Sequence, residues 1–307
     1  MSQVKYSDPG LTLNTAATIP SLGLGVYQLE GEECKELVLQ ALKTGYRLID
    51  TAQFYRNENA VGQAVRESGI PREEIFITTK VQAGAHTVEG CKRKVEKSLS
   101  DLGLDYIDLF LIHGPLMGPE KRVDTWSNLV DFMHRSEGKI RAVGVSNFGI
   151  AHLEALREEG LEIPSVNQIE LHPHLPQTPI VDYCKSKGIV IQAYCPLMRG
   201  QQNQASLGEG AGWAGKAGFG WDHEGLKGVA EKENMTIGQV LLKWSIQKGY
   251  CPQAKTSSPT RLKENLDVLH LPPLSEESMN ELEKMNLEGR EEEVGRLALE
   301  WNPVDCP

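Results

Sequence analysis

Three short apolar segments of the sequence each end in a residue that can hold or transfer a proton. The first ends in Asp50, with Tyr55 close behind it, the second ends in Lys80, and the third ends in His113. The interior of a buried strand disfavours charge, so such residues belong where a strand meets its loop. If the three strands are parallel neighbours, their ends meet, and the four side chains form one acid–base site.

The elements that would position these residues alternate between strand and helix. The chain of 307 residues is within the range of one barrel. From residue 22 to residue 194, β-rich segments and amphipathic helices repeat about every 30 residues, which is typical of βαβ units. We therefore expect a single domain over residues 1–307, an α/β fold of the (β/α)8 TIM barrel type. It would have a short N-terminal hairpin cap and long loops at its carboxyl-terminal face. A doubly wound open sheet is the alternative, less favoured because no glycine-rich turn follows the first strand.

Some local patterns have competing interpretations. Gly23 and Gly25 could begin a dinucleotide fingerprint, but a third glycine is missing, so close approach of the backbone at a strand end is favoured. His172 and His174 form the one closely spaced histidine pair, which we interpret as loop structure; no metal site is predicted. A helix is expected over 124–137, ending before a glycine.

Composition excludes several classes of partner. The formal net charge of −10 offers no basic surplus for nucleic acid or an anionic membrane. No apolar run approaches the roughly 18 residues of a membrane span. The six cysteines lack paired spacing and no signal peptide is recognised, so a cytoplasmic chain with reduced thiols is expected. Nothing in the sequence demands more than a monomer.

A long irregular segment over residues 199–222 interrupts the alternation. It is rich in glycine, glutamine and alanine, and it carries Trp213, Phe219 and Trp221. A loop of this length in a compact domain is usually functional or disordered. The aromatic side chains favour a functional loop, while disorder remains the alternative.

A basic, hydroxyl-rich stretch later in the chain opens a helix. Lys255, Ser257, Ser258 and Arg261 fall together there, and the N–H groups of a helix start attract anions. In a barrel, phosphate is expected at the loop after the eighth strand. A phosphate site is favoured over a solvated cap with stray charges.

Taken in order, these segments resemble the aldo-keto reductase family over about residues 22–290. The resemblance rests on the stretches 45–58, 77–81, 105–113, 144–148, 167–168, 193–197 and 255–265. It implies reversible hydride transfer between NADPH and an aldehyde or ketone, which is reduced to the alcohol. Some relatives of this fold are cofactor-sensing regulatory subunits with little turnover, and that alternative stays open.

The resemblance assigns a role to each residue of the acid–base site. Tyr55 would be the general acid, and His113 would donate a hydrogen bond to the carbonyl oxygen. Because the ordinary tyrosine pKa is about 10, we expect the Lys80 cation to lower the pKa of Tyr55, with Asp50 holding Lys80 in place. A structural ion-pair network and a lyase with Lys80 as Schiff-base nucleophile are the alternatives.

Cofactor contacts follow from the same resemblance. Ser146, Asn147 and Gln168 would bind the carboxamide, and Tyr194 would stack under the nicotinamide. Arg261, with Lys255, would bind the 2′-phosphate, so NADPH is predicted over NADH. The full predicted set is Val26, Tyr27, Asp50, Ser146, Asn147, Gln168, Tyr194, Pro196, Leu197, Lys255, Thr256, Ser257, Arg261, Glu264 and Asn265.

The predicted substrate pocket departs from the family pattern. Tyr27 and Gly114 stand where tryptophan is frequent, and Gln82 stands where an aromatic residue is common. We expect the aromatic residues of segment 199–222 to close over a roomier, more polar pocket. Predicted substrate contacts are Tyr27, Phe54, Tyr55, His113, Trp213, Phe219 and Trp221. Sugar aldehydes, α-keto or diketo compounds, and aliphatic or aromatic aldehydes all remain open as substrates.

Overall fold

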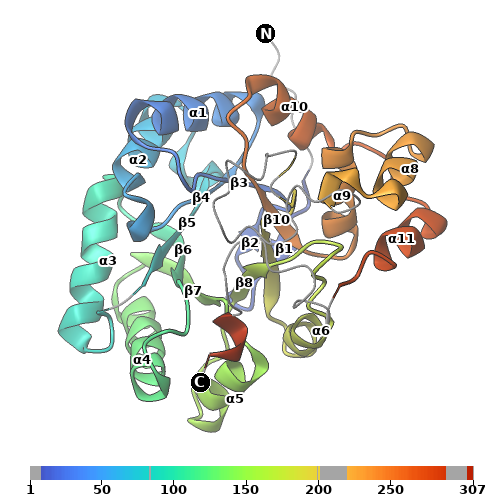
Figure 1. Ribbon diagram of the computed structural model, residues 1–307. Helices are drawn as coiled ribbons and strands as arrows, with labels where there is room; N and C mark the ends of the chain where they lie inside the picture. Colours follow the sequence, from blue (N-terminus) through green and yellow to red (C-terminus); the bar gives the residue numbers. More distant parts are fainter. Residues whose placement is uncertain (1–7, 83, 199, 201–219, 288–302, 307) are drawn as a thin grey trace.

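Eight parallel strands close into a barrel (Figure 1). The structure, a computed structural model, describes residues 8–82, 84–198, 200, 220–287 and 303–306. Around the barrel the strands follow the order β10-β3-β4-β5-β6-β7-β8-β9, so the last strand pairs with the first. Their bounds are β3 (Gly23–Gly25), β4 (Leu48–Asp50), β5 (Phe76–Val81), β6 (Ile107–Ile112), β7 (Ile140–Ser146), β8 (Val166–Glu170), β9 (Val190–Tyr194) and β10 (Cys251–Ala254). The predicted TIM barrel is confirmed.

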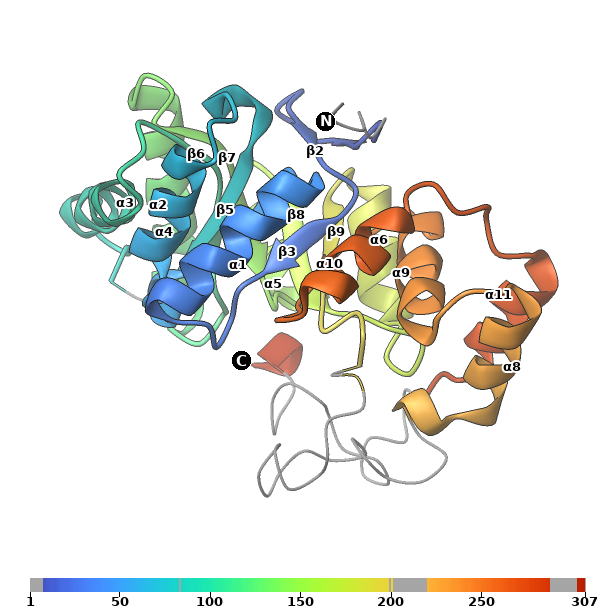
Figure 2. The ribbon, with the colours of Figure 1, turned by 90° about the horizontal axis from the view of Figure 1, so that it is seen from above.

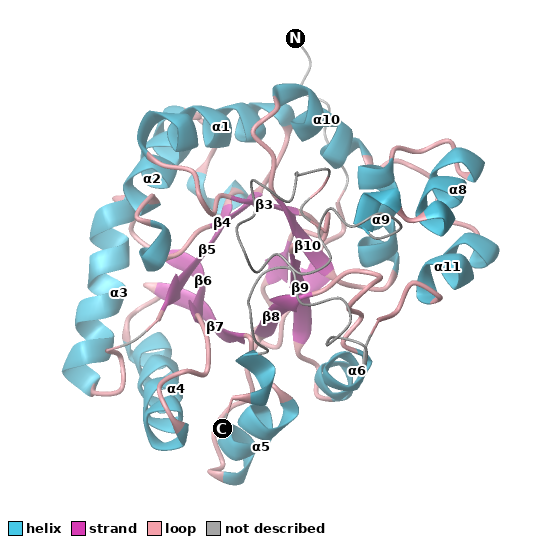
Figure 3. Cartoon of the chain, viewed as in Figure 1, coloured by secondary structure: helices cyan, strands magenta, loops and turns pink. Residues whose placement is uncertain are grey.

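Helices surround the strands on the outside (Figure 3). They are α1 (Gly31–Thr44), α2 (Glu58–Glu67), α3 (Val88–Leu102), α4 (Pro119–Arg135), α5 (Ile150–Glu158), α6 (Thr178–Ser186), α8 (Glu224–Lys232), α9 (Ile237–Gln247), α10 (Pro259–Asp267) and α11 (Glu276–Glu283). Short 3-10 turns are η1 (Gln53–Tyr55), η2 (Arg72–Glu74), η3 (Gly220–Asp222) and η4 (Pro303–Asp305). No helix in the described ranges has the length and apolar character to cross a membrane.

Helix α4 begins earlier than the sequence pattern indicated. The prediction of a start at Asp124 was wrong, because the helix already begins at Pro119. Its first turn is polar, which hides the apolar periodicity there. Proline suits this first position, since its fixed backbone angle matches a helix and its missing N–H would have had no partner. Beyond that turn, Trp126 is completely buried and its indole N–H donates to the Glu162 carbonyl at 2.8 Å.

The predicted N-terminal hairpin is present and closes one end of the barrel. β1 (Leu11–Thr12) pairs antiparallel with β2 (Thr18–Ile19), and Figure 2 shows this hairpin at the end of the molecule away from the C-terminus. Leu13 and Ile19 pack with side chains from the strand starts into a small core inside the barrel. A larger core fills the space between the strands and the helices. The hairpin therefore seals the amino-terminal end of the barrel.

The C-terminal turn η4 lies at the other end, against the start of α5 (Figure 1). The backbone N–H of Gly149 donates to His152 Nδ1 at 3.0 Å, and His152 Nε2 is hydrogen-bonded to the Cys306 carbonyl. A Cβ atom placed on Gly149 would lie 2.1 Å from the Val304 carbonyl oxygen, so any side chain at this position would collide with it. This glycine lets the C-terminal segment dock closely.

Candidate active site

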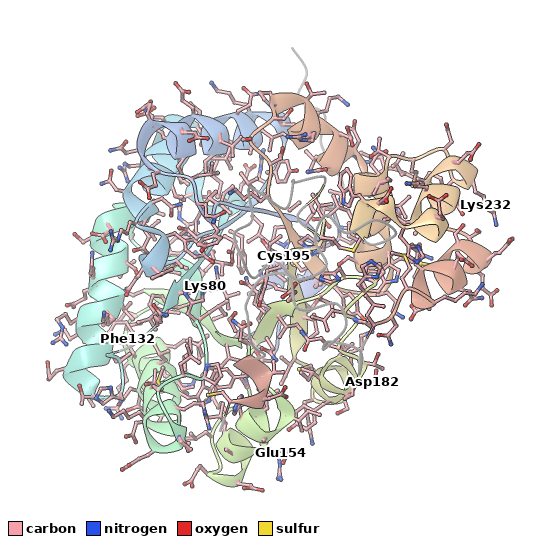
Figure 4. The ribbon with its side chains drawn as sticks, viewed as in Figure 1. Lys80, Phe132, Glu154, Asp182, Cys195 and Lys232 are labelled. Carbon is pink, nitrogen blue, oxygen red and sulfur yellow. The ribbon has the colours of Figure 1, made fainter. Side chains whose placement is uncertain are left out.

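The structure brings the four predicted acid–base residues together at the carboxyl end of the strands. Asp50 ends β4, Lys80 lies near the end of β5, His113 directly follows β6, and Tyr55 ends η1. Lys80 Nζ lies 2.5 Å from Asp50 Oδ1 and 3.4 Å from Tyr55 Oη. The rings of Tyr55 and His113 meet edge to face, with centroids 5.6 Å apart. Figure 4 shows Lys80 inside the ring of helices.

Lys80 and Asp50 form a buried ion pair. The lysine side chain has no exposed surface, and Asp50 is 4% exposed. Lys80 Nζ also donates to the Thr51 carbonyl at 2.8 Å. Burial lowers the pKa of Lys80, while the charge and hydrogen bond of Asp50 act in the opposite direction. The pair holds a positive charge beside the Tyr55 hydroxyl.

The pKa of the Tyr55 hydroxyl differs from the expectation. Burial raises the pKa of Tyr55 well above its ordinary value, and the negative charge of Asp50 raises it further. The expected net lowering of the Tyr55 pKa was wrong: the sequence shows the nearby cation, but not that the fold removes the phenol from water. Tyr55 therefore keeps its proton at neutral pH, as a proton donor must.

His113 is a neutral imidazole. Burial, followed by the charge of Lys80, lowers the pKa of His113 to about 3. Its backbone N–H donates to the Val81 carbonyl at 2.8 Å, which holds the residue at the strand end. Its Nδ1 atom is buried with no hydrogen-bond partner among the described residues. The ring can thus donate one hydrogen bond without carrying charge.

A second polar group adjoins the ion pair. Gln168 Nε2 donates to Asp50 Oδ2 at 2.7 Å and to Gln192 Oε1 at 3.1 Å. Both N–H bonds of this amide are thereby used, so its oxygen is left to accept a hydrogen bond. Asn147 Nδ2 donates to the His113 carbonyl at 3.1 Å, and the Tyr194 hydroxyl donates to Asn147 Oδ1 at 2.8 Å. These bonds orient polar side chains beside the catalytic candidates.

A cavity of about 790 Å³ lies over this site and extends to the start of α10. It is lined by most of the predicted site residues. These are Tyr27, Asp50, Phe54, Tyr55, His113, Ser146, Asn147, Gln168, Tyr194, Pro196, Leu197, Trp221, Lys255, Thr256, Ser257, Arg261, Glu264 and Asn265. One cavity thus joins the acid–base site to the basic loop.

Two predicted residues lie behind the cavity wall. Lys80 is covered by Asp50 and Tyr55. Val26 is fully buried; its N–H donates to the Asp50 carbonyl at 3.1 Å, and its carbonyl accepts from Asn57 Nδ2 at 2.9 Å. Val26 therefore fixes the backbone at Asp50. Trp213 and Phe219 lie outside the described residues.

The basic loop after β10 forms an ordered helix start. The Ser258 hydroxyl accepts from the Arg261 N–H at 3.4 Å and caps α10. Thr256 Oγ1 accepts from Arg261 Nε at 3.2 Å, which orients the guanidinium. Asn265 Nδ2 is buried with no hydrogen-bond partner among the described residues. A buried donor of this kind, in a cavity that Lys255 and Arg261 also line, is suited to a polar group of a bound ligand.

Several cavity residues were missed by the sequence analysis. They are Gln28, Leu29, Glu33, Leu116, Cys195, Gly200, Gly238 and Gln253. Cys195, near the centre in Figure 4, could have been found because it stands between two predicted residues. Gln253 had no local signal, since it faces Gly23 only because β10 closes onto β3. A Cβ at Gly23 would lie 2.1 Å from Gln253 Oε1, so close packing explains this glycine.

The histidine pair lies in a tight turn after β8. The segment from His172 to Leu175 forms an antiparallel bridge. Among the residues that the structure describes, no group of three or more His, Cys, Asp and Glu side chains is arranged to hold a metal ion.

Comparison with known proteins decides the family. The model of the aldo/keto reductase family matches residues 21–287, most of the chain. The chain belongs to the aldo/keto reductase family. Membership and the oxidoreductase class, both expected from the sequence, are thereby confirmed.

Curated and solved relatives agree with this assignment. This aldo-keto reductase is 42% identical to "Glyoxal reductase" of Bacillus subtilis over 92% of its own length and 94% of the relative's. It is 38% identical to "Glycerol 2-dehydrogenase (NADP(+))" of Saccharomyces cerevisiae, over 91% of its own length and 92% of the relative's. The structure of an aldo-keto reductase from a Medee basin deep-sea metagenome library superposes on this chain with a TM-score of 0.80 at 36% sequence identity. The match covers 90% of this chain and 95% of the other.

Proposed function

We propose that this aldo-keto reductase reduces an aldehyde or ketone to the alcohol with NADPH, and that Tyr55 donates the proton. The observation that carries the proposal is the Tyr55 hydroxyl, which lies 3.4 Å from the Lys80 ammonium and lines the same cavity as His113. The NADP(+) in the name of the yeast relative supports the choice of cofactor. Oxidation of NADPH in the presence of a carbonyl compound tests the proposal; binding without turnover would favour the regulatory alternative.

The side chains of the site act on the substrate oxygen. Tyr55 donates its proton to the carbonyl oxygen, and the neutral His113 ring donates a hydrogen bond that orients it. When bound, the reduced nicotinamide supplies the hydride that the carbonyl carbon receives. Lys80 balances the negative charge that remains on the Tyr55 oxygen after proton transfer, and Asp50 keeps Lys80 in position.

The geometry disfavours the lyase alternative. A Schiff-base lysine must approach a substrate carbonyl with its amine. Lys80 Nζ is instead enclosed by Asp50, Thr51 and Tyr55, and its side chain has no exposed surface. Its position suits a charge that acts on Tyr55 rather than a nucleophile.

Arg261→Ala is expected to weaken NADPH binding by about ten- to a hundredfold, because a hydrogen bond to a charged group is lost. The affinity for NADH should stay within about twofold of the wild-type value. The guanidinium, held by Thr256, would contact the 2′-phosphate that NADH lacks. Fluorescence titration with both cofactors measures the two dissociation constants. Lys263→Ala removes an exposed cation of the same helix, paired with Asp267, and is the matched control. An equal loss of NADH and NADPH affinity would contradict the phosphate contact.

Carbonyl reduction should show no ionisation of His113 between about pH 5 and pH 8, where an ordinary histidine titrates. The pKa of His113 is lowered to about 3, so the ring stays neutral throughout this range. The profile of kcat/KM against pH measures this. An inflection near the ordinary histidine pKa that disappears in His113→Asn would show that the ring titrates instead.

For the substrate, we infer that short, oxygenated aldehydes and ketones are the first compounds to test. The names of the bacterial and yeast relatives both point to small oxygenated molecules. Tyr27, Phe54 and Leu116 are partly exposed at the cavity wall, so an apolar side of the substrate would also find contacts. A panel with glyoxal, a triose and benzaldehyde separates these possibilities by their kcat/KM. The monomeric state and the cytoplasmic location stay predictions.

A further inference from the structure

His174 connects two segments that are far apart in the sequence. Its ring is 2% exposed and lies in the tight turn between β8 and α6. Nδ1 is 2.8 Å from the Met285 carbonyl, and Nε2 is 2.9 Å from the backbone N–H of Gly220. The His174 carbonyl also accepts from the Leu287 N–H at 3.0 Å. The residue is therefore anchored to the segment that follows α11 and holds the first residue of η3.

These two contacts determine which ring nitrogen carries the proton. A backbone N–H can only donate, so Nε2 must accept from Gly220 with its lone pair. A carbonyl can only accept, so Nδ1 must carry the hydrogen that faces Met285. The pKa of His174 is lowered to about 4, mainly by burial; the hydrogen bond with the Met285 carbonyl acts in the opposite direction, and the neighbouring His172 and His223 contribute to the lowering. A neutral ring with this one tautomer satisfies both partners.

The segment that His174 holds carries Trp221 into the cavity wall. Trp221 Nε1 donates to the Leu197 carbonyl at 2.8 Å, and a Cβ at Gly200 would lie 3.9 Å from the indole ring. Leu197 in turn lies near Gly238. A Cβ atom placed on Gly238 would be 3.9 Å from Leu197 Cδ2 and 3.9 Å from Glu264 Oε1. Trp221 lines the same cavity as Glu264 and Asn265, the residues proposed to contact the adenosine of the cofactor. A contact of Trp221 with the substrate stays a prediction from the sequence.

We propose that His174 is a positioning residue that holds Trp221 against bound NADPH and so slows release of the cofactor. Without the acceptor at Nε2, the first residue of η3 loses its hydrogen bond to the turn after β8. The indole would then spend less time against the cofactor. This inference rests on the proposed binding of NADPH in the cavity, and it concerns retention of the cofactor rather than the chemical step.

Two substitutions separate the contacts of His174. In His174→Asn the amide reaches about as far as Nδ1, so it can still donate to Met285, but no acceptor reaches Gly220. In His174→Gln an oxygen reaches about as far as Nε2 and can accept from Gly220. We expect the asparagine variant to bind NADPH about five- to tenfold more weakly, as loss of one buried hydrogen bond implies, with a matching rise in the dissociation rate. The glutamine variant should bind within about twofold of the wild type.

The fluorescence of bound NADPH measures the dissociation constant, and stopped-flow displacement measures the dissociation rate. Equal NADPH affinity in the asparagine variant and the wild type would overturn the proposal, as would equal weakening by asparagine and glutamine. If wild-type protein itself fails to bind NADPH, the proposed function fails instead, which keeps the two failures distinct.

Trp221→Ala tests the route of the effect. If His174 acts through Trp221, His174→Asn adds less than about twofold to the dissociation constant in the alanine background, because effects on one pathway are not additive. A full additional loss in the double variant would assign His174 a different role. If His174→Asn does not fold, Trp221→Ala still tests whether the indole retains NADPH. An unchanged NADPH affinity in Trp221→Ala would refute the proposal.

Discussion

Tyr55→Phe is expected to lower kcat/KM for carbonyl reduction by about three orders of magnitude, near the upper end of what a positioned proton donor contributes. The substitution removes one oxygen and keeps the ring that packs against His113 and Tyr27. NADPH affinity should therefore stay within a few-fold of the wild type. Because burial raises the pKa of Tyr55, wild-type reduction should also persist above the ordinary tyrosine pKa of about 10.

Steady-state reduction of an active carbonyl compound and titration with NADPH measure the two effects of this substitution. Tyr183→Phe is the matched control: it removes the same atom from α6, where the hydroxyl contacts Glu154 away from the cavity. If Tyr55→Phe retained a tenth or more of wild-type turnover, another group would have to donate the proton.

Lys80→Met should affect both stability and catalysis. The substitution leaves the Asp50 carboxylate buried without its cation, and breaking such a pair costs about 3–5 kcal/mol of folding free energy. Turnover should fall at least about a hundredfold, because no cation stabilises the charge that forms on the Tyr55 oxygen. Chemical denaturation measures the free energy of unfolding, and reduction kinetics measure the catalytic loss.

The double variant Asp50→Asn with Lys80→Met separates these two effects. It removes both charges, so most of the lost stability should return. The side-chain oxygen of asparagine at position 50 can still accept a hydrogen bond from Gln168 Nε2, so this contact is preserved. Activity should not return, since the cation is still absent. Recovery of both stability and activity would show that Lys80 serves only to neutralise Asp50.

The sequence was informative where one rule of sheet geometry applies. Parallel strands present their carboxyl ends at one edge, so Asp50, Lys80 and His113 could be placed together without any coordinates. The basic loop was found for a similar reason, because the capping residues of α10 are neighbours in sequence. The roles of these side chains remain proposals that the experiments above address.

Features that depend on depth or on distant neighbours could not be predicted. The raised pKa of Tyr55 follows from desolvation and from the charge of Asp50 and the neighbours Tyr27 and Cys195, which come from different segments of the chain. Gln192 reaches Gln168 only because β8 and β9 are paired in the barrel. His174 looked like simple loop structure, because its partners Gly220 and Met285 lie far along the chain.

The opposite positions of the hairpin and η4 have a practical consequence. The hairpin covers the barrel end away from the cavity, whereas Cys306 is tied through His152 to the cavity end. A resin or electrode coupled at the hairpin would leave the cavity end of the barrel facing bulk liquid. Coupling at Cys306 would pull on the docked segment beside α5, so the first orientation should preserve more turnover in an immobilised reactor.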